Sequence, residues 1–116
     1  MAVPYDPLVN ANRLIHQGAQ FTAIFATNDI MGFGAKKALE ENNIEIPEQV
    51  SLVGYGDILL SSAIGLTTVS QPGYEMGTRA MSLLVNLING RVEPPQRIML
   101  RPSLVIRSSC MRMAAS

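Results

Sequence analysis

The amino-acid sequence predicts an α/β domain built on an open parallel sheet with flanking helices. Two short apolar segments, 22–26 and 50–55, each end on polar residues, and a stretch with helical spacing separates them. Asn28 follows the first segment, and the Gly56-Asp57 turn follows the second. A connection of this length suits a right-handed βαβ crossover, which makes the two strands parallel neighbours. Their carboxyl ends would then meet at one edge of the sheet, where open α/β sheets hold their ligands.

The elements around the first strand follow from the spacing of apolar residues. Residues 8–17 carry apolar side chains at helical spacing and predict a short helix. The strand at 22–26 is almost continuously apolar, which favours a parallel strand covered on both faces. A second helix over 30–42 follows, with Asn28 or Asp29 in the capping position at its start.

A strongly amphipathic helix dominates the second half of the chain. It spans 74–89 and carries a stripe of six apolar residues at helical spacing. The short segment before it, 66–70, is rich in Thr and Val and predicts a third strand. The remaining expectations are an irregular segment or single helical turn at 58–65, strands at 97–100 and 104–107, and a frayed tail beyond Ser109.

The composition limits the classes of protein to which the chain can belong. Apolar residues make up 47% of the 116 residues and charged residues 16%, which suits a folded core and excludes a disordered chain. Nine basic and nine acidic residues cancel, so the chain lacks the positive surface of a DNA-binding domain. No apolar run approaches the roughly 20 residues needed to cross a bilayer. No signal peptide is recognisable and Cys110 is the only cysteine, so we expect a reducing, cytoplasmic location.

Three stretches in a fixed order carry a resemblance to a known family. They are 22–29, the pair 50–58 and 66–72, and 104–109. Each stretch alone is a weak signal. Their order and spacing together resemble the lactose/galactose-repressor family of bacterial transcription regulators, over roughly residues 9–109.

The resemblance implies a periplasmic-binding-protein-like fold, of which this chain contains only part of a two-lobed core. In such regulators a separate helix-turn-helix binds operator DNA, while the core binds a small sugar-like effector and forms a homodimer. The implied division is a carboxyl-terminal lobe at 1–66, a crossover strand and helix of the other lobe at 67–103, and a final strand and tail at 104–116. The helix at 74–89 would then pack on a sheet that this chain lacks.

The resemblance also implies three ligand-binding residues, Asn28, Asp57 and Gln71. An asparagine side chain donates and accepts hydrogen bonds at once, as a sugar diol requires, and the alternative for Asn28 is a plain helix cap. Asp29 is interpreted as stabilising the amino end of its own helix. Gln71 matches a position at the crossover between the lobes, with an exposed linker residue as the alternative.

Gly56 departs from the family pattern. The family usually has Gly-Phe/Tyr-Asp-Asp here, and its first aspartate grips the effector, but this chain has Gly54-Tyr-Gly-Asp. Either the effector is not held there as a typical sugar is, or Asp57 swings in through the backbone freedom that Gly56 allows. We favour the first interpretation.

A dimer contact is expected along the 30–42 helix and the segment after Asp57, because these regions form the interface in the family. Glycine is unfavourable inside a helix, so Gly32 and Gly34 imply close packing against a strand or a second subunit. Core packing is the alternative for the apolar residues of the segment after Asp57. The expected interface residues are Met31, Gly34, Ala35, Leu60 and Ile64.

No enzyme site is recognisable in the sequence. His16, the only histidine, is expected on the surface. No Ser-His-Asp set, metal-spaced cluster or phosphate loop occurs, so neither a cofactor nor a metal is expected. The leading hypothesis is the effector-binding and dimerisation region of a transcription regulator. The alternative is a sugar- or solute-binding protein of a transporter, which shares the two-lobed fold but needs an export signal.

Overall fold

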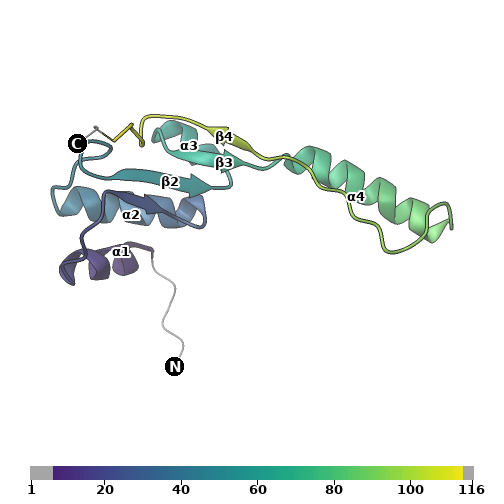
Figure 1. The fold of residues 1–116 in the computed structure, drawn as a ribbon, viewed down its shortest axis with the longest axis horizontal. Helices are drawn as coiled ribbons and strands as arrows, with labels where there is room; N and C mark the ends of the chain where they lie inside the picture. Colours follow the sequence, from purple (N-terminus) through teal and green to yellow (C-terminus); the bar gives the residue numbers. More distant parts are fainter. Residues whose placement is uncertain (1–6, 114–116) are drawn as a thin grey trace, which may run out of the picture. The chain divides into compact units, whose positions relative to one another are not determined.

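The computed structural model describes residues 7–113. Within that range helices and strands alternate along the chain (Figure 1). Most expected elements are confirmed to within two residues, and the segment at 58–65 contains a short helix. The elements are α1 Pro7–His16, β1 Ala23–Phe25, α2 Asp29–Glu41, β2 Ser51–Tyr55, α3 Leu59–Ala63, β3 Thr67–Ser70, α4 Gly73–Ile88 and β4 Ser103–Val105.

The strands form one sheet in the order β1-β2-β3-β4. β1 pairs with β2 in parallel, with Ala23 opposite Ser51, and β2 pairs with β3 in parallel, with Val53 opposite Thr67. The α/β class and the parallel arrangement of the first strands are therefore confirmed. The βαβ connection through α2 places the carboxyl ends of β1 and β2 at the same edge of the sheet.

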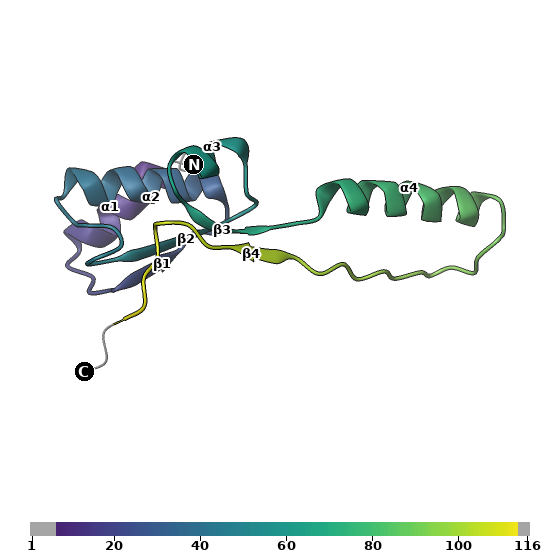
Figure 2. The same ribbon diagram turned by 90° about the horizontal axis from the view of Figure 1, so that it is seen from above.

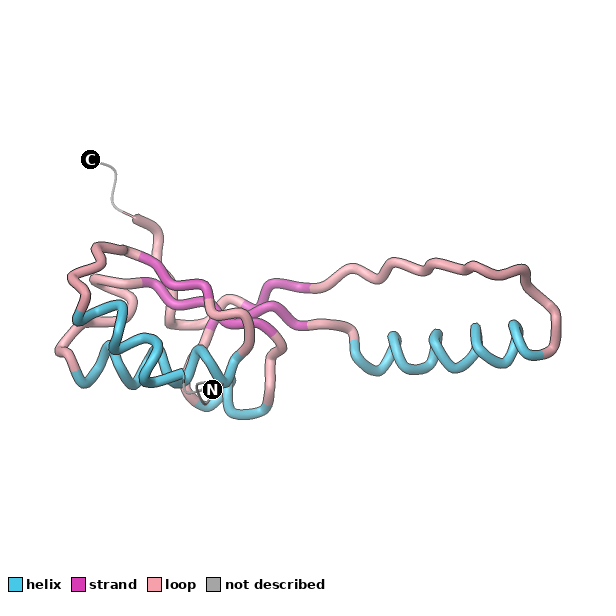
Figure 3. Tube along the Cα trace, turned by 90° about the horizontal axis from the view of Figure 1, so that it is seen from below, coloured by secondary structure: helices cyan, strands magenta, loops and turns pink. Residues whose placement is uncertain are grey.

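The helices α1 and α2 lie on the same side of the sheet (Figures 2 and 3). α2 packs directly on the strands, and α1 packs on α2. Small residues on the inner face of α2 allow this close approach, since a Cβ on Gly32 would stand only 3.1 Å from Leu66 Cδ2. The prediction of close packing against a strand is thus confirmed for Gly32. The buried core cluster is Ala11, Ala35, Ala38, Leu52 and Leu66.

The prediction that the first strand is covered on both faces is wrong. Phe25 is 61% exposed, and Ala23 is exposed as well. β1 is an edge strand, and the helices of this unit cover only one face of the sheet. The apolar run therefore has a covered side and an open side within the described residues.

The chain divides into two compact units. The first comprises the residues up to Ser70 together with those from Leu104 onward, and the second comprises Gln71–Ser103. We expected the division at 66/67, but β3 pairs with β2, so Thr67–Ser70 lie in the first unit.

The second unit contains α4 and the extended segment that follows it. α4 begins one residue before the expected start, and none of its residues is buried. The predicted strand at 97–100 is absent, and this segment has no regular structure. A strand needs a neighbouring strand to satisfy its backbone groups, and the second unit offers none. Among the described residues, no helix has both the length and the apolar character needed to cross a membrane.

The end of the described chain is held against the sheet rather than frayed. Ser109 is 7% exposed, and its carbonyl accepts a 2.8 Å hydrogen bond from the amide of Leu52. The Met111 amide donates to Oγ of Ser51 at 3.3 Å. The expectation of a frayed tail beyond Ser109 is therefore wrong as far as Met111, because backbone groups there find partners on β2.

Candidate functional site

Asn28 stands at the turn between β1 and α2 and caps the helix. Its backbone is extended, and its Oδ1 accepts a 2.9 Å hydrogen bond from the amide of Met31. The side chain is otherwise exposed. The capping alternative is thus observed directly. The ligand role remains a prediction, since the amide nitrogen of Asn28 can still donate to a bound molecule.

The side chain of Asp29 is buried and bonded to three other segments of the chain. Asp29 is the first residue of α2, but its side chain is only 1% exposed, so it does not simply sit on the surface at the helix end. Its Oδ2 accepts hydrogen bonds from the amide of Ile58 at 3.1 Å and the hydroxyl of Ser61 at 2.5 Å. Its Oδ1 accepts one from the hydroxyl of Thr68 at 2.7 Å. The interpretation of Asp29 as a local helix stabiliser therefore missed its principal contacts.

These hydrogen bonds determine the charge of Asp29. Burial alone would raise the pKa of this carboxyl, but the hydroxyls of Ser61 and Thr68 and the nearby backbone amides lower it more, so the net pKa lies below its ordinary value. The Asp29 side chain also occupies the space beside Gly54 in β2, where any Cβ would collide with its Oδ1. Glycine at position 54 is therefore a requirement of this buried carboxylate.

The contacts of Asp29 join the turns that follow β1 and β2. Asp29 is the neighbour of Asn28, and its donor Ile58 is the neighbour of Asp57. The sequence prediction that these two turns meet at one edge of the sheet is confirmed by this hydrogen bond.

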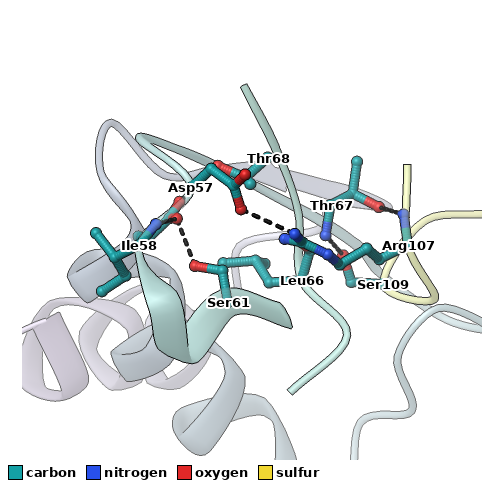
Figure 4. A network of polar contacts seen from close by, with 9 residues as sticks. Asp57, Ile58, Ser61, Leu66, Thr67, Thr68, Arg107 and Ser109 are labelled. Carbon is teal, nitrogen blue, oxygen red and sulfur yellow. Dashed lines mark hydrogen bonds and ion pairs between the residues drawn. The ribbon is translucent and has the colours of Figure 1, made fainter. Parts of the chain in front are cut away.

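Asp57 is engaged by a cation that sequence reasoning did not assign. Arg107 donates from Nη2 to Oδ1 of Asp57 at 2.9 Å and from Nη1 to the carbonyl of Leu66 at 2.9 Å. Figure 4 shows the guanidinium directed at the Asp57 carboxylate. The only signal in the sequence was a single basic residue within the otherwise uncharged stretch 104–109. A paired Asp57 supports the interpretation that it does not replace the missing family carboxylate.

The conformation of the turn explains why glycine stands at position 56. Gly56 has φ +125, a region that L-residues rarely adopt, and Asp57 follows with φ +55. The amide of Gly56 donates to the carbonyl of Val69 on β3 at 2.8 Å, which holds the turn in this shape. Nothing lies within 4 Å of the position that a Gly56 Cβ would occupy. The positive φ of Gly56, rather than a close contact at its Cβ position, is therefore what favours glycine there.

The third predicted ligand residue lies in the other unit. Gln71 is exposed and begins the segment Gln71–Ser103, whereas Asn28 and Asp57 belong to the first unit. The structure therefore brings together two of the three predicted ligand residues within one unit.

The predicted dimer residues differ in how far they are exposed. Leu60 is 50% exposed, and its neighbours Ile58 and Leu59 are 40% and 93% exposed, so α3 presents an open apolar surface. Ala35, in contrast, is 5% exposed within the core. Ile64 is half-buried against the same core, which is the alternative stated for the apolar residues. Met31 and Gly34 are half-buried on α2.

Other candidate features carry no recognisable chemistry. His16 is exposed at the end of α1, as expected. Over residues 7–113 no group of three or more His, Cys, Asp or Glu side chains could hold a metal ion. A hollow of about 610 Å³ lies beside the carboxyl-terminal half of α2, and neither Asn28 nor Asp57 lines it.

Comparisons with known proteins agree with this arrangement. The model of the periplasmic binding protein-like domain matches residues 5–110. The chain is 37% identical over 108 residues to the HTH-type transcriptional repressor PurR of Pasteurella multocida, covering 91% of this chain and 32% of that protein. The chain thus spans about a third of the length of this relative. Such relatives are transcriptional repressors, which does not favour the transporter alternative or an enzyme.

Solved structures give the same result. The lac repressor dimer bound to operator and the anti-inducer ONPF matches with a TM-score of 0.86 and 29% identity, covering 91% of this chain and 37% of that one. A LacI family transcriptional regulator from Arthrobacter sp. FB24, in complex with lactose, matches with a TM-score of 0.82 and 30% identity, covering 90% and 40%. The chain therefore belongs to the periplasmic binding protein-like domain family, as the resemblance to the lactose/galactose-repressor regulators predicted.

Proposed function

We propose that this chain is the effector-binding and dimerisation region of a bacterial transcription regulator that acts in the cytoplasm. The observation that carries the proposal is the hydrogen bond from Ile58 to Asp29, which joins the turns after β1 and β2 at one edge of the sheet. This edge is the place where open α/β folds bind ligands. The relatives named PurR are HTH-type transcriptional repressors, which supports a regulatory role for the edge.

The proposed effector is a small sugar-like molecule, and Asn28 is its principal contact in this unit. Oδ1 of Asn28 already accepts from the Met31 amide, so the side-chain nitrogen is the group available to a ligand hydroxyl. Asp57 contributes less, because its carboxylate is paired with Arg107. Gln71 would contribute from the other side of the crossover. The lactose complex of the Arthrobacter regulator supports this ligand class.

The proposed homodimer uses the exposed apolar surface of α3, with Leu60 at its centre. Three consecutive apolar residues, Ile58 to Leu60, are exposed there, which is unusual for a surface without a partner. A symmetric contact of this kind would bury each copy of the patch against the other. Leu60→Asp should shift sedimentation of the chain toward monomer, because it would place an unpaired charge in the contact. Leu14→Asp on α1 is the matched control, because Leu14 is 48% exposed and lies outside the proposed contact.

Operator binding would belong to a separate helix-turn-helix. The 116 residues have zero formal net charge, so counterion release offers little drive for DNA binding by this chain alone. A gel-shift titration of the purified chain should show no sequence-specific, salt-sensitive complex. Such a complex would contradict this division of labour.

The ligand role of Asn28 can be separated from its capping role by two substitutions. Asn28→Ala removes both the cap and the amide, whereas Asn28→Ser keeps an acceptor for the Met31 amide and removes only the amide group. We expect both variants of the full-length regulator to bind the effector about ten- to a hundred-fold more weakly, because a buried polar contact is worth about 1–3 kcal/mol. Calorimetry with a panel of small sugars and nucleosides measures this. Full recovery of affinity in Asn28→Ser would leave Asn28 as a cap alone.

A further inference from the structure

The short helix α3 depends on another helix for the acceptor at its amino end. Its N-cap residue is Ile58, which has no side-chain hydrogen bond to offer. The Asp29 carboxylate, at the start of α2, supplies the acceptor instead through the amide of Ile58 and the hydroxyl of Ser61. A negative group at the amino end of a helix is favourable. The position of α3 is therefore set by a residue of α2.

Asp29 holds its charge in the interior without a cation. Among residues 7–113, no salt bridge involves Asp29, and its exposed fraction is 1%. A buried charge is costly, and an apolar residue of similar size would often be more stable. Only oriented donors offset that cost here, and those donors come from the turn before α3, from α3 itself and from β3. This arrangement favours a role in position rather than in stability alone.

We propose that Asp29 is a positioning residue that couples the effector-binding edge to the α3 surface. The inference rests on the proposed function, because it takes Asn28 as the effector contact and Leu60 as part of the dimer contact. Asn28 caps α2, so a shift of Asn28 moves the start of that helix and the neighbouring carboxylate. That carboxylate is bonded to Ile58 and Ser61, so α3 must follow.

Two hydroxyls provide a matched pair of test variants. Ser61 and Thr68 are both fully buried, and each donates one hydrogen bond to Asp29. Only Ser61 belongs to α3, whereas Thr68 belongs to the sheet. Ser61→Ala therefore removes one of the two hydrogen bonds that join Asp29 to α3 and its N-cap, and the bond from the Ile58 amide remains. Thr68→Val removes an equivalent hydrogen bond and leaves both of these contacts in place.

Hydrogen exchange of the 116-residue chain tests the connection directly. In Ser61→Ala, the amides of α3 should exchange roughly ten-fold faster relative to those of β2, the scale of one lost hydrogen bond to a charged group. In Thr68→Val, the amide exchange rates of α3 and of β2 should change by a similar factor. Asp29→Asn should resemble Ser61→Ala if it folds. Equal α3 exchange in Ser61→Ala and Thr68→Val, each relative to β2, would overturn the proposal.

A double-mutant cycle tests the coupling itself. Asn28→Ala should speed α3 exchange several-fold in the parent and by a smaller factor in the Ser61→Ala background, because one of the two hydrogen bonds of the connection is already lost. In the Thr68→Val background, Asn28→Ala should speed α3 exchange by the same factor as in the parent. Purely additive effects in both backgrounds would contradict a positioning role. This readout needs no effector, so loss of sugar binding or of self-association in other experiments would count against the proposed function and leave the coupling result standing.

Discussion

α2 and α4 are both amphipathic, but only α2 is buried. α2 contributes Asp29, Gly32, Ala35, Ala38 and Leu39 to the interior, whereas α4, which is longer and has the clearer apolar stripe, contributes no buried residue. The difference lies in their surroundings, because α2 has a sheet beneath it within its own unit and α4 has none. A hydrophobic face thus predicts that a helix will seek a partner, and the rest of the fold decides whether it finds one.

The exposed side of α4 is energetically expensive in water. Tyr74, Met81 and Ile88 are 89%, 61% and 74% exposed, and each square ångström of apolar surface costs about 25 cal/mol. We propose that the other lobe of a two-lobed core covers this face, as the division of the family fold implies. Paired substitutions in the two units measure this difference in burial.

The largest difference is expected for leucine truncation. Leu52 on β2 is fully buried, and Leu52→Ala should lower the free energy of unfolding by about 2–5 kcal/mol, through lost burial and the cavity left behind. Leu84 on α4 is 50% exposed, and Leu84→Ala should change it by less than about 0.5 kcal/mol. Urea denaturation of both variants measures this. A similar loss in the two would mean that α4 is packed after all.

Glycine substitutions should act in opposite directions in the two units. Gly54→Ala places a Cβ against the Asp29 carboxylate and should destabilise the first unit by about 1–3 kcal/mol, the cost of disturbing buried polar contacts. Gly77 lies inside α4 with open space at its Cβ position. Alanine favours the helical backbone over glycine by about 1 kcal/mol, so Gly77→Ala should stabilise α4 and increase its helix content. Circular dichroism during thermal unfolding distinguishes them. Loss of helix in Gly77→Ala would contradict the exposure of α4.

A smaller effect is expected from acid. The pKa of Asp29 is lower in the folded chain than its ordinary value of 3.8, so the folded state binds fewer protons than the unfolded state in that range. The stabilisation from Asp29 is therefore complete above about pH 4–5 and is lost as the pH falls through the folded pKa. In Asp29→Asn, the free energy of unfolding should decrease less steeply as the pH falls below that range. Glu75→Gln on α4, where the exposed side chain pairs with Arg79, is the control and should change the free energy of unfolding at neutral pH by less than about 1 kcal/mol.

Local patterns in the sequence were sufficient for most of the fold. The helical spacing in 30–42 and 74–89, the cap at Asn28 and the glycine at the end of β2 depend on near neighbours, and they predicted the elements within two residues. The meeting of the turns after β1 and β2 also followed, since parallel neighbours share an edge.

The contacts of the charged residues could not be read from local patterns. The donors to Asp29 lie 29, 32 and 39 residues away, and Arg107 lies 50 residues from Asp57. These pairs depend on how the strands assemble, which no short window of sequence contains. The open side of β1 was missed for a related reason, because an apolar run does not state how many layers cover it.

We expect the first unit to fold by itself and the second to require a further surface that covers α4. β3 and the returning chain run in opposite directions, since Gly65 pairs with Ser108 and the Arg107 amide bonds to Thr67 Oγ1. A short glycine-rich linker can therefore replace Gln71–Ser103. Thermal unfolding of this shortened chain should remain cooperative, with a midpoint close to that of the parent. Loss of the cooperative transition would show instead that the first unit needs the second for its stability.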